Sequence, residues 1–429
     1  MGEARVLTTL ENRGPCAALA RCRLLLWLLL LASALLLSVT FRLWTPQTLF
    51  PRVPLIRILV GAPAWGEWSL LAITAGALGV AAVGSYRHTP WQPALCVFAL
   101  ALGGLVLFDQ HRAQPWVWQF LLTALVLVRC PQRRAVLALK LLTLGIYFHS
   151  AIAKLDFSFC NSLGPLFLQT MFSPFGVATA QWPVATQRLV ALLFPLGELA
   201  TVAALAMPRW NRAGVAATFV MHTVMIAILG PWGLQQRPGV LIWNLFCMVE
   251  AVVLFWPEPV SAHPADEPHE VRTSKGAGVQ ALIVVAVFAP FLEPWGLIDV
   301  WPAWGLYAAH GERATILLHE SACSRLPADV LRQLDGTTAS PPWLRLRYDR
   351  WSLETVAAPV YPQNRFALGV ALAVARQNDL ERFQIRIQLD SAANRWTGRR
   401  SSRTLTGEQA IADEAGRFWL NAIPDQAVP

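Results

Sequence analysis

The sequence predicts an all-α membrane domain of about nine transmembrane helices, followed by a small α+β domain. The 429 residues are 55% hydrophobic and only 14% charged, whereas soluble domains average about 25% charged residues. Several apolar stretches approach the roughly 20 residues that a helix needs to cross a bilayer core. The net charge of +9 is attributed to loop arginines, which orient the spans and meet anionic lipid head groups. We therefore expect contact with the lipid bilayer and no binding of nucleic acid.

Hydropathy identifies the individual spans. They are expected at residues 24–40, 68–84, 93–108, 115–128, 135–153, 187–206, 214–230, 238–256 and 279–292. The first resembles the apolar part of a signal peptide. However, it has no A-x-A-like cleavage site before Phe41-Arg42, so an uncleaved span is expected. The segment 45–66 is rich in Pro, which breaks the helical hydrogen-bond ladder, and it predicts an interfacial loop or half-helix.

The arginines set the expected orientation, because cytoplasmic loops are enriched in Lys and Arg. Arginines precede the first span and lie in the loops after the fourth and sixth spans. Alternation from a cytoplasmic N terminus puts all of these loops in the cytoplasm. Nine spans would then make the C-terminal domain extracytoplasmic, and a miscount of one span would invert that side.

The composition also sets the expected domain boundaries. They are 1–256 for the transmembrane domain, 257–278 for a charged, Pro-rich linker, 279–292 for the last span and 293–429 for the soluble domain. In the soluble domain, residues 314–321, 343–349 and 383–389 predict strands, and residues 364–376 and 407–416 predict helices.

Known catalytic spacings are missing from the sequence. It contains no Walker loop, H-E-x-x-H, G-x-S-x-G or C-x-x-C motif, so any chemistry must come from groups gathered from several helices. The seven Cys have no metal-ligand spacing, and no metal site is expected. Cys160 and Cys323 are both expected to be extracytoplasmic, and the sequence allows a disulfide between them.

Ionisable residues in or beside the spans are the candidate functional residues, because charge is costly in a bilayer. "FDQHRAQPW" (108–116) places Asp109, His111 and Arg112 in a short turn between two spans. A solvated loop is the alternative interpretation of this turn.

Lys154 is the second candidate. Ser150 lies four residues before it and Tyr147 three residues further back, so all three share one helical face. The alternative is a lysine that snorkels to the interface beside Asp156.

Two more candidates lie deep in later spans. Glu198 is a lone carboxylate in the sixth span, beside Pro195 and Gly197, and His222 lies within the seventh span. Each can equally be a helix-packing group that hydrogen-bonds to a neighbour. Glu250 lies near a helix end and is expected to carry little function.

"YFHSAIAKLDFSF" (147–159) with the following "FSPF" (172–175) resembles the membrane domain of vitamin K-dependent gamma-glutamyl carboxylase. That domain is shared with many bacterial membrane proteins, the HTTM (horizontally transferred transmembrane) domain family. "FDQHRAQPW" and "FVMHTVM" (219–225) resemble two further family segments, in the same order, and together the segments cover roughly residues 20–260. The animal enzyme has two adjacent lysines, and Ala153 replaces the first of them here. The tail is also shorter than the enzyme's lumenal region.

The resemblance implies that Lys154 is the base that deprotonates a reduced quinone of the vitamin K type. The hydroquinone reacts with O₂, becomes a stronger base and removes a γ-proton from a substrate glutamate, whose carbanion captures CO₂. It also implies that His111 binds or stabilises the oxygenated quinone, and that an extracytoplasmic protein or peptide is the substrate. Asp109, Tyr147, Ser150, Glu198 and His222 are then binding residues. A physical argument agrees, since a desolvated ammonium at a hydrophobic helix end favours the neutral amine, which can act as a base.

Two non-enzymatic hypotheses remain open from the sequence. One is a redox-associated membrane protein of the MauE/DoxX type, whose C-terminal domain binds a partner. The other is a transporter with Glu198 and His222 along its pathway. The sequence contains no inverted repeat with paired broken helices, which argues against the transporter.

Overall fold

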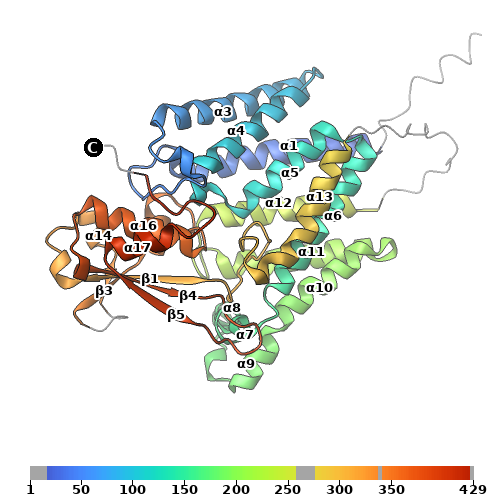
Figure 1. The fold of residues 1–429 in the computed structure, drawn as a ribbon. Helices are drawn as coiled ribbons and strands as arrows, with labels where there is room; N and C mark the ends of the chain where they lie inside the picture. Colours follow the sequence, from blue (N-terminus) through green and yellow to red (C-terminus); the bar gives the residue numbers. More distant parts are fainter. Residues whose placement is uncertain (1–16, 258–275, 337–340, 426–429) are drawn as a thin grey trace, which may run out of the picture.

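A computed structural model describes residues 17–257, 276–336 and 341–425. The helices form an elongated bundle, and a β-sheet with its covering helices lies against one end of it (Figure 1). The linker predicted at 257–278 falls almost wholly outside the described residues.

All nine predicted spans are helical. Among the described residues, seven helical segments are long and apolar enough to cross a membrane. They are α1 (Ala17–Val39), α3 (Ala64–Tyr86), α6 (Gln132–Ile152), α9 with α10 (Val184–Ala191 and Leu193–Ala206), α11 (Asn211–Leu229), α12 (Pro238–Phe255) and α13 (Ala277–Phe288), which a 3-10 helix, η6 (Ala289–Trp295), continues. The third and fourth predicted spans are the shorter apolar helices α4 (Gln92–Phe108) and α5 (Pro115–Arg129).

The Pro-rich segment after α1 is a loop, which is the first of the two alternatives predicted for it. After the short α2 (Phe41–Trp44), a single 3-10 turn, η1 (Arg57–Leu59), precedes α3. Proline fixes φ and removes a backbone donor, so the segment runs as irregular chain. Phe50 and Val53 are nevertheless buried, because they pack against the C-terminal domain.

The C-terminal domain contains one antiparallel sheet of five strands in the order β2-β3-β1-β4-β5. The strands are β1 (Arg313–His319), β2 (Leu334–Asp335), β3 (Trp343–Leu346), β4 (Ile385–Asp390) and β5 (Ser402–Thr406). The three predicted strands are confirmed as β1, β3 and β4. The prediction for 343–349 ran too far, because Tyr348 already begins helix α15 (Tyr348–Thr355). The edge strands β2 and β5 were not predicted, since neither has the alternation of apolar and polar residues that burial of one face produces.

Helix α16 (Asn364–Gln377) fixes how the sheet meets the bundle. Twelve of its residues, from Asn364 to Ala375, are buried, because it lies between the sheet and the Pro-rich loop. Gly369 permits this approach, since a Cβ there would stand 2.6 Å from Cγ2 of Val53. The predicted helix at 407–416 is confirmed as α17 (Glu408–Ala415), and a short α14 (Ala328–Leu331) completes the domain.

Candidate functional site

One pocket collects five of the residues that the sequence singled out. Tyr147, Ser150, Lys154, Glu198 and His222 all line a cavity of about 60 Å³ between α6, α10, α11 and α12. The bundle brings them together because α10 and α11 pack beside each other and α6 packs against α10. Tyr147, Ser150 and Lys154 therefore face one pocket, as their spacing predicted.

Lys154 and Glu198 form a buried ion pair. Nζ of Lys154 lies 2.9 Å from each carboxylate oxygen of Glu198, and it also donates to Oγ of Ser150 at 2.6 Å and to the Ser150 carbonyl at 3.0 Å. The two residues are only 2% and 7% exposed. The snorkelling interpretation of Lys154 is thus wrong, because its charge meets a carboxylate inside the protein.

Tyr147, His222 and Asn244 form a second hydrogen-bonded line in the same pocket. The Asn244 side-chain amide donates to the Val240 carbonyl at 2.7 Å, which turns its oxygen toward Nδ1 of His222 at 2.7 Å. Nδ1 must therefore carry a proton, and in the neutral ring Nε2 is an acceptor. The Tyr147 hydroxyl lies 3.0 Å from Nε2 and donates to it. The line fixes one tautomer of His222 and one orientation of the phenol.

The cost of charge in a membrane does not single out Asn244 as a site residue. Its amide is neutral and sits in the apolar run "LIWNLF", so it carries no charge signal. The weak signal was His222 itself, since a buried imidazole needs a partner for each ring nitrogen.

A larger cavity of about 280 Å³ adjoins the pocket. The two share the lining residues Val240, Trp243, Leu306 and Tyr307. The larger one lies between the bundle and the C-terminal domain, and Trp116, Trp301 and several prolines make its walls mostly apolar. A ligand with a polar head and an apolar body would fit the combined shape, since ligand sites pair apolar walls with a few placed polar groups.

Glu250 is more than the inert helix-end residue expected from sequence. It is 1% exposed, and it accepts hydrogen bonds from Gln119 at 2.8 Å and from Thr143 at 3.4 Å. Gln119 also accepts one from the Trp243 indole at 2.8 Å. A polar chain therefore leads from the pocket wall at Trp243 to Glu250 in the centre of the bundle.

His111 does not line the pocket of Lys154. Its Nε2 lies 3.1 Å from the Pro359 carbonyl and 3.0 Å from the Ser352 hydroxyl, both in the C-terminal domain. Burial lowers the pKa of His111 to about 3, so the ring is neutral and holds the two domains together. The structure offers no geometric support for joining it to Lys154.

Asp109 and the rest of its turn are also buried, so the solvated-loop interpretation is wrong. Asp109 accepts a hydrogen bond from the His111 backbone at 3.1 Å and is fully buried. Gln110 bonds to the carbonyls of Pro54 and Asn421, and Arg365 of α16 donates to Gln110 at 2.8 Å. The turn anchors the C-terminal domain on the bundle.

Cys160 and Cys323 are both free thiols, so the disulfide that the sequence allowed is absent. Cys160 lies in α7 (Phe157–Asn161), near the start of β1, and Cys323 lies beyond the end of β1 (Figure 1). A strand of seven residues spans roughly 20 Å, and bridged Cys have Cα atoms less than about 7 Å apart. No group of His, Cys, Asp and Glu that could hold a metal occurs among the described residues.

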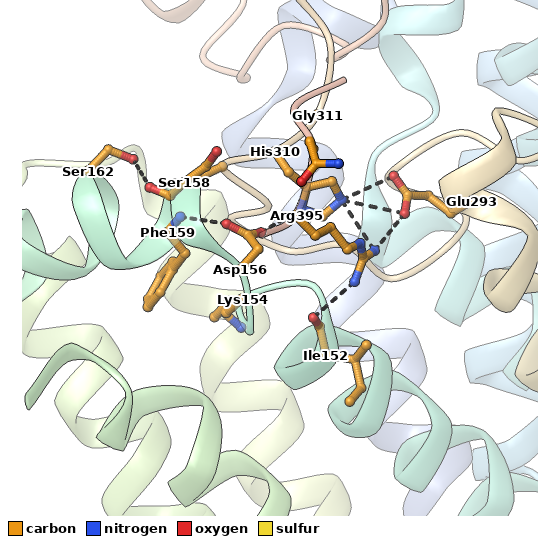
Figure 2. A network of polar contacts seen from close by, with 12 residues as sticks. Ile152, Lys154, Asp156, Ser158, Phe159, Ser162, Glu293, His310, Gly311 and Arg395 are labelled. Atoms are coloured by element: carbon orange, nitrogen blue, oxygen red, sulfur yellow. Dashed lines mark hydrogen bonds and ion pairs between the residues drawn. The ribbon is translucent and has the colours of Figure 1, made fainter. Parts of the chain in front are cut away.

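A cluster of four charged residues lies directly beside Lys154 (Figure 2). His310 stands between two carboxylates, with Nδ1 at 2.7 Å from Asp156 and Nε2 at 3.2 Å from Glu293. Arg395 donates to Glu293 at 2.9 Å. The sequence had placed Asp156 only as a neighbour of Lys154, and its long-range partners gave no local signal.

This cluster predicts a pH-dependent stability. Burial on its own would lower the pKa of His310, but hydrogen bonds to Asp156 and Glu293 outweigh it and raise the pKa from 6.5 to about 8. Because the folded value is the higher one, the contribution of about 2 kcal/mol is complete below the unfolded pKa and is lost as pH rises through about 8. Chemical unfolding in detergent micelles should therefore give a difference between wild type and His310→Gln that shrinks by this amount from about pH 6 to about pH 9. A pH-independent difference would contradict the assignment.

No protein-family model, no curated protein and no solved structure matches the chain.

Proposed function

We propose that the chain is a membrane enzyme of the carboxylase-like class, in which Lys154 takes a proton from a hydroquinone-type lipid. One observation carries the proposal. The Lys154–Glu198 pair and the Tyr147–His222–Asn244 line converge on one pocket, which continues into a larger apolar cavity. Retention of ionisable groups inside a bundle is the usual mark of a functional site.

The lining of the two cavities suits a quinone ring with an apolar tail. Aromatic residues and prolines surround the larger cavity, whose volume of about 280 Å³ approaches the roughly 300–1,000 Å³ of ligand sites. Tyr307 lines both cavities, and its hydroxyl makes no hydrogen bond to any residue of 17–257, 276–336 or 341–425. A bound hydroquinone would supply, with O₂ and CO₂, the oxidative chemistry that side chains lack.

The ion pair offers a balanced route for the proton. Glu198 can accept the ammonium proton of Lys154 across 2.9 Å, which leaves a neutral amine and a carboxylic acid. The amine then takes a hydroxyl proton from the ligand, so the pair ends as ammonium and carboxylic acid while the ligand carries the negative charge. The short distance and the exclusion of water favour such a transfer.

The resemblance of "YFHSAIAKLDFSF" to the carboxylase supports the same role for Lys154. The carboxylase model adds two further elements to the proposal, an extracytoplasmic placement of the C-terminal domain and a protein or peptide as the acceptor. We do not assign His111 to the oxygenated quinone, because His111 does not line the Lys154 pocket.

The direct test is epoxide formation from vitamin K hydroquinone and O₂ by the purified protein in detergent. We expect turnover by the wild type and a loss of at least about a hundredfold for Lys154→Ala, the usual contribution of a general base. Lys140→Ala is the matched control, because Lys140 lies on the same helix outside the pocket and packs over Phe255.

Two outcomes would overturn parts of the proposal. Absence of epoxide with several hydroquinones would remove the enzymatic function. Equal turnover by wild type and Lys154→Ala would remove only the base assignment and would direct attention to His222.

A further inference from the structure

The turn that carries Lys154 is four residues long. Helix α6 ends at Ile152 and α7 begins at Phe157, so residues 153–156 connect the two helices at the edge of the pocket, which Lys154 lines. Within the turn, the Lys154 backbone amide bonds to the Ala151 carbonyl at 3.0 Å. The Ser150 contacts of Lys154 come from its own helix, whereas Glu198 belongs to α10. The position of the turn therefore decides whether Nζ reaches Glu198.

The C-terminal domain holds this turn from both ends. Arg395 donates through Nη1 to the Ile152 carbonyl at 3.3 Å, and its own carbonyl accepts the Phe157 amide at 2.7 Å. His310 bonds to Asp156 at 2.7 Å. These contacts fall on residues that flank Lys154 by two or three positions on each side (Figure 2).

Charges on both partners strengthen the contacts that fix the turn. Each ring nitrogen of His310 faces a carboxylate, and Nε2 also lies 3.4 Å from Nη2 of Arg395. The two carboxylates outweigh the arginine, and as an imidazolium the ring donates to both of them. Asp156 uses its other oxygen to cap α7 through the Phe159 amide at 2.6 Å. Hydrogen bonds between charged groups are the stronger class, and the bond between His310 and Asp156 is buried. Two carboxylates and two cations leave the cluster neutral, with its geometry fixed.

The loop between β4 and β5 (residues 391–401, the clamp loop) also lies close to Phe157, the first residue of α7. Gly398 has a φ of +68°, and a Cβ there would clash with the ring of Phe157. The Ala393 amide ties the same loop to the His310 carbonyl at 2.7 Å. His310 and Arg395 thus act from one rigid piece of the C-terminal domain.

We propose that His310 and Arg395 are positioning residues that hold the Lys154 ammonium against Glu198, so that the C-terminal domain assembles the pocket. The catalytic consequence rests on the proposed function, but the positioning itself does not. Neither residue lines the pocket, and both act through the turn.

The test observes Lys154 directly. The chain has only three lysines, Lys140, Lys154 and Lys275, so isotopically labelled lysine ammonium groups give few nuclear magnetic resonance signals. Lys154→Arg and Lys140→Arg assign them. In the full-length protein in detergent micelles, we expect the buried, paired Lys154 ammonium to exchange its protons slowly with water. In His310→Phe and Arg395→Met the exchange should accelerate at least about tenfold, because the pair opens more often.

Matched controls come from the end of β1, the strand that follows His310, and from the loop that carries Arg395. His319→Phe changes a histidine at the far end of β1, and Arg399→Met removes an exposed arginine four residues from Arg395. Both should leave Lys154 exchange at the wild-type rate. Arg395→Lys, which keeps a cation beside Glu293, should recover part of the protection.

The outcomes separate positioning from simple stabilisation. If His310→Phe fails to fold, Arg395→Met and the milder Arg395→Gln carry the test. Wild-type Lys154 exchange in folded Arg395 variants would overturn the proposal, even if their thermal stability fell. If the wild type does not turn over hydroquinones, the proposed function is wrong. The exchange measurement still tests the positioning of Lys154. If turnover exists, the same variants should lose kcat and keep KM.

Discussion

Glu198→Leu is expected to lower the free energy of unfolding by about 3–5 kcal/mol, because it strands a buried ammonium without its carboxylate. Lys154 is 2% exposed and its other hydrogen bonds go to neutral oxygens of Ser150. Neither oxygen can offset the charge. Equilibrium unfolding in mixed detergent micelles would measure the loss.

The double variant Lys154→Met/Glu198→Leu provides the control. Replacing both members of a buried ion pair by apolar residues of similar size is often neutral or stabilising, so most of the lost stability should return. An additive loss in the double variant would contradict the buried-pair interpretation. Recovery of stability without recovery of turnover would mean that the pair serves chemistry and not the fold.

Arg112→Met should also cost about 3–5 kcal/mol of unfolding free energy. The guanidinium is fully buried and donates to the carbonyls of Leu43 at 2.9 Å, Thr45 at 2.9 Å and Leu105 at 3.3 Å. It also pairs with Glu67. Its removal takes a charged donor from these carbonyls and a cation from Glu67, at the junction of α2, α3 and α4.

Arg42→Met is the matched control for Arg112, because Arg42 is exposed and its substitution should change stability by less than about 0.5 kcal/mol. Arg112→Lys should remain destabilising, since one ammonium cannot replace a planar fork that reaches several carbonyls. Thermal unfolding of the three variants, followed by circular dichroism, would decide. Equal midpoints for Arg112→Met and Arg42→Met would show that the buried arginine is dispensable.

Local sequence patterns predicted the parts of the site that one element defines. The spacing of Tyr147, Ser150 and Lys154 placed them on one face, and the cost of charge in a membrane singled out Glu198 and His222. Such patterns do not name partners from distant elements. His310 lies 154 residues from Asp156, and Arg395 lies 243 residues from Ile152. His111 was misplaced for the same reason, because its partners lie in α15 and the loop that follows.

The same difference between local patterns and contacts with distant elements decided which parts of the fold were predicted. Hydropathy located the nine helical segments that were predicted as spans, because burial in lipid requires long apolar runs, but it did not locate the short helices α2, α7 and α8 (Leu163–Phe172). Strands β1 and β4 alternate and were predicted, whereas β5 is exposed along Ser402–Thr404 and is held mainly by its pairing with β4. Pairing of this kind leaves almost no trace in composition.

The clamp on residues 153–156 also has a consequence for biosynthesis. Chains fold from the N terminus as they leave the ribosome, so α6, α10 and α11 are inserted before His310 and Arg395 have been translated. Until then Asp156 and the Ile152 carbonyl lack the partners that fix the turn. The Lys154–Glu198 pair is therefore fixed only after the last third of the chain has been translated. A chain truncated before His310 would insert into the membrane, but its Lys154–Glu198 pair would lack the contacts that fix it.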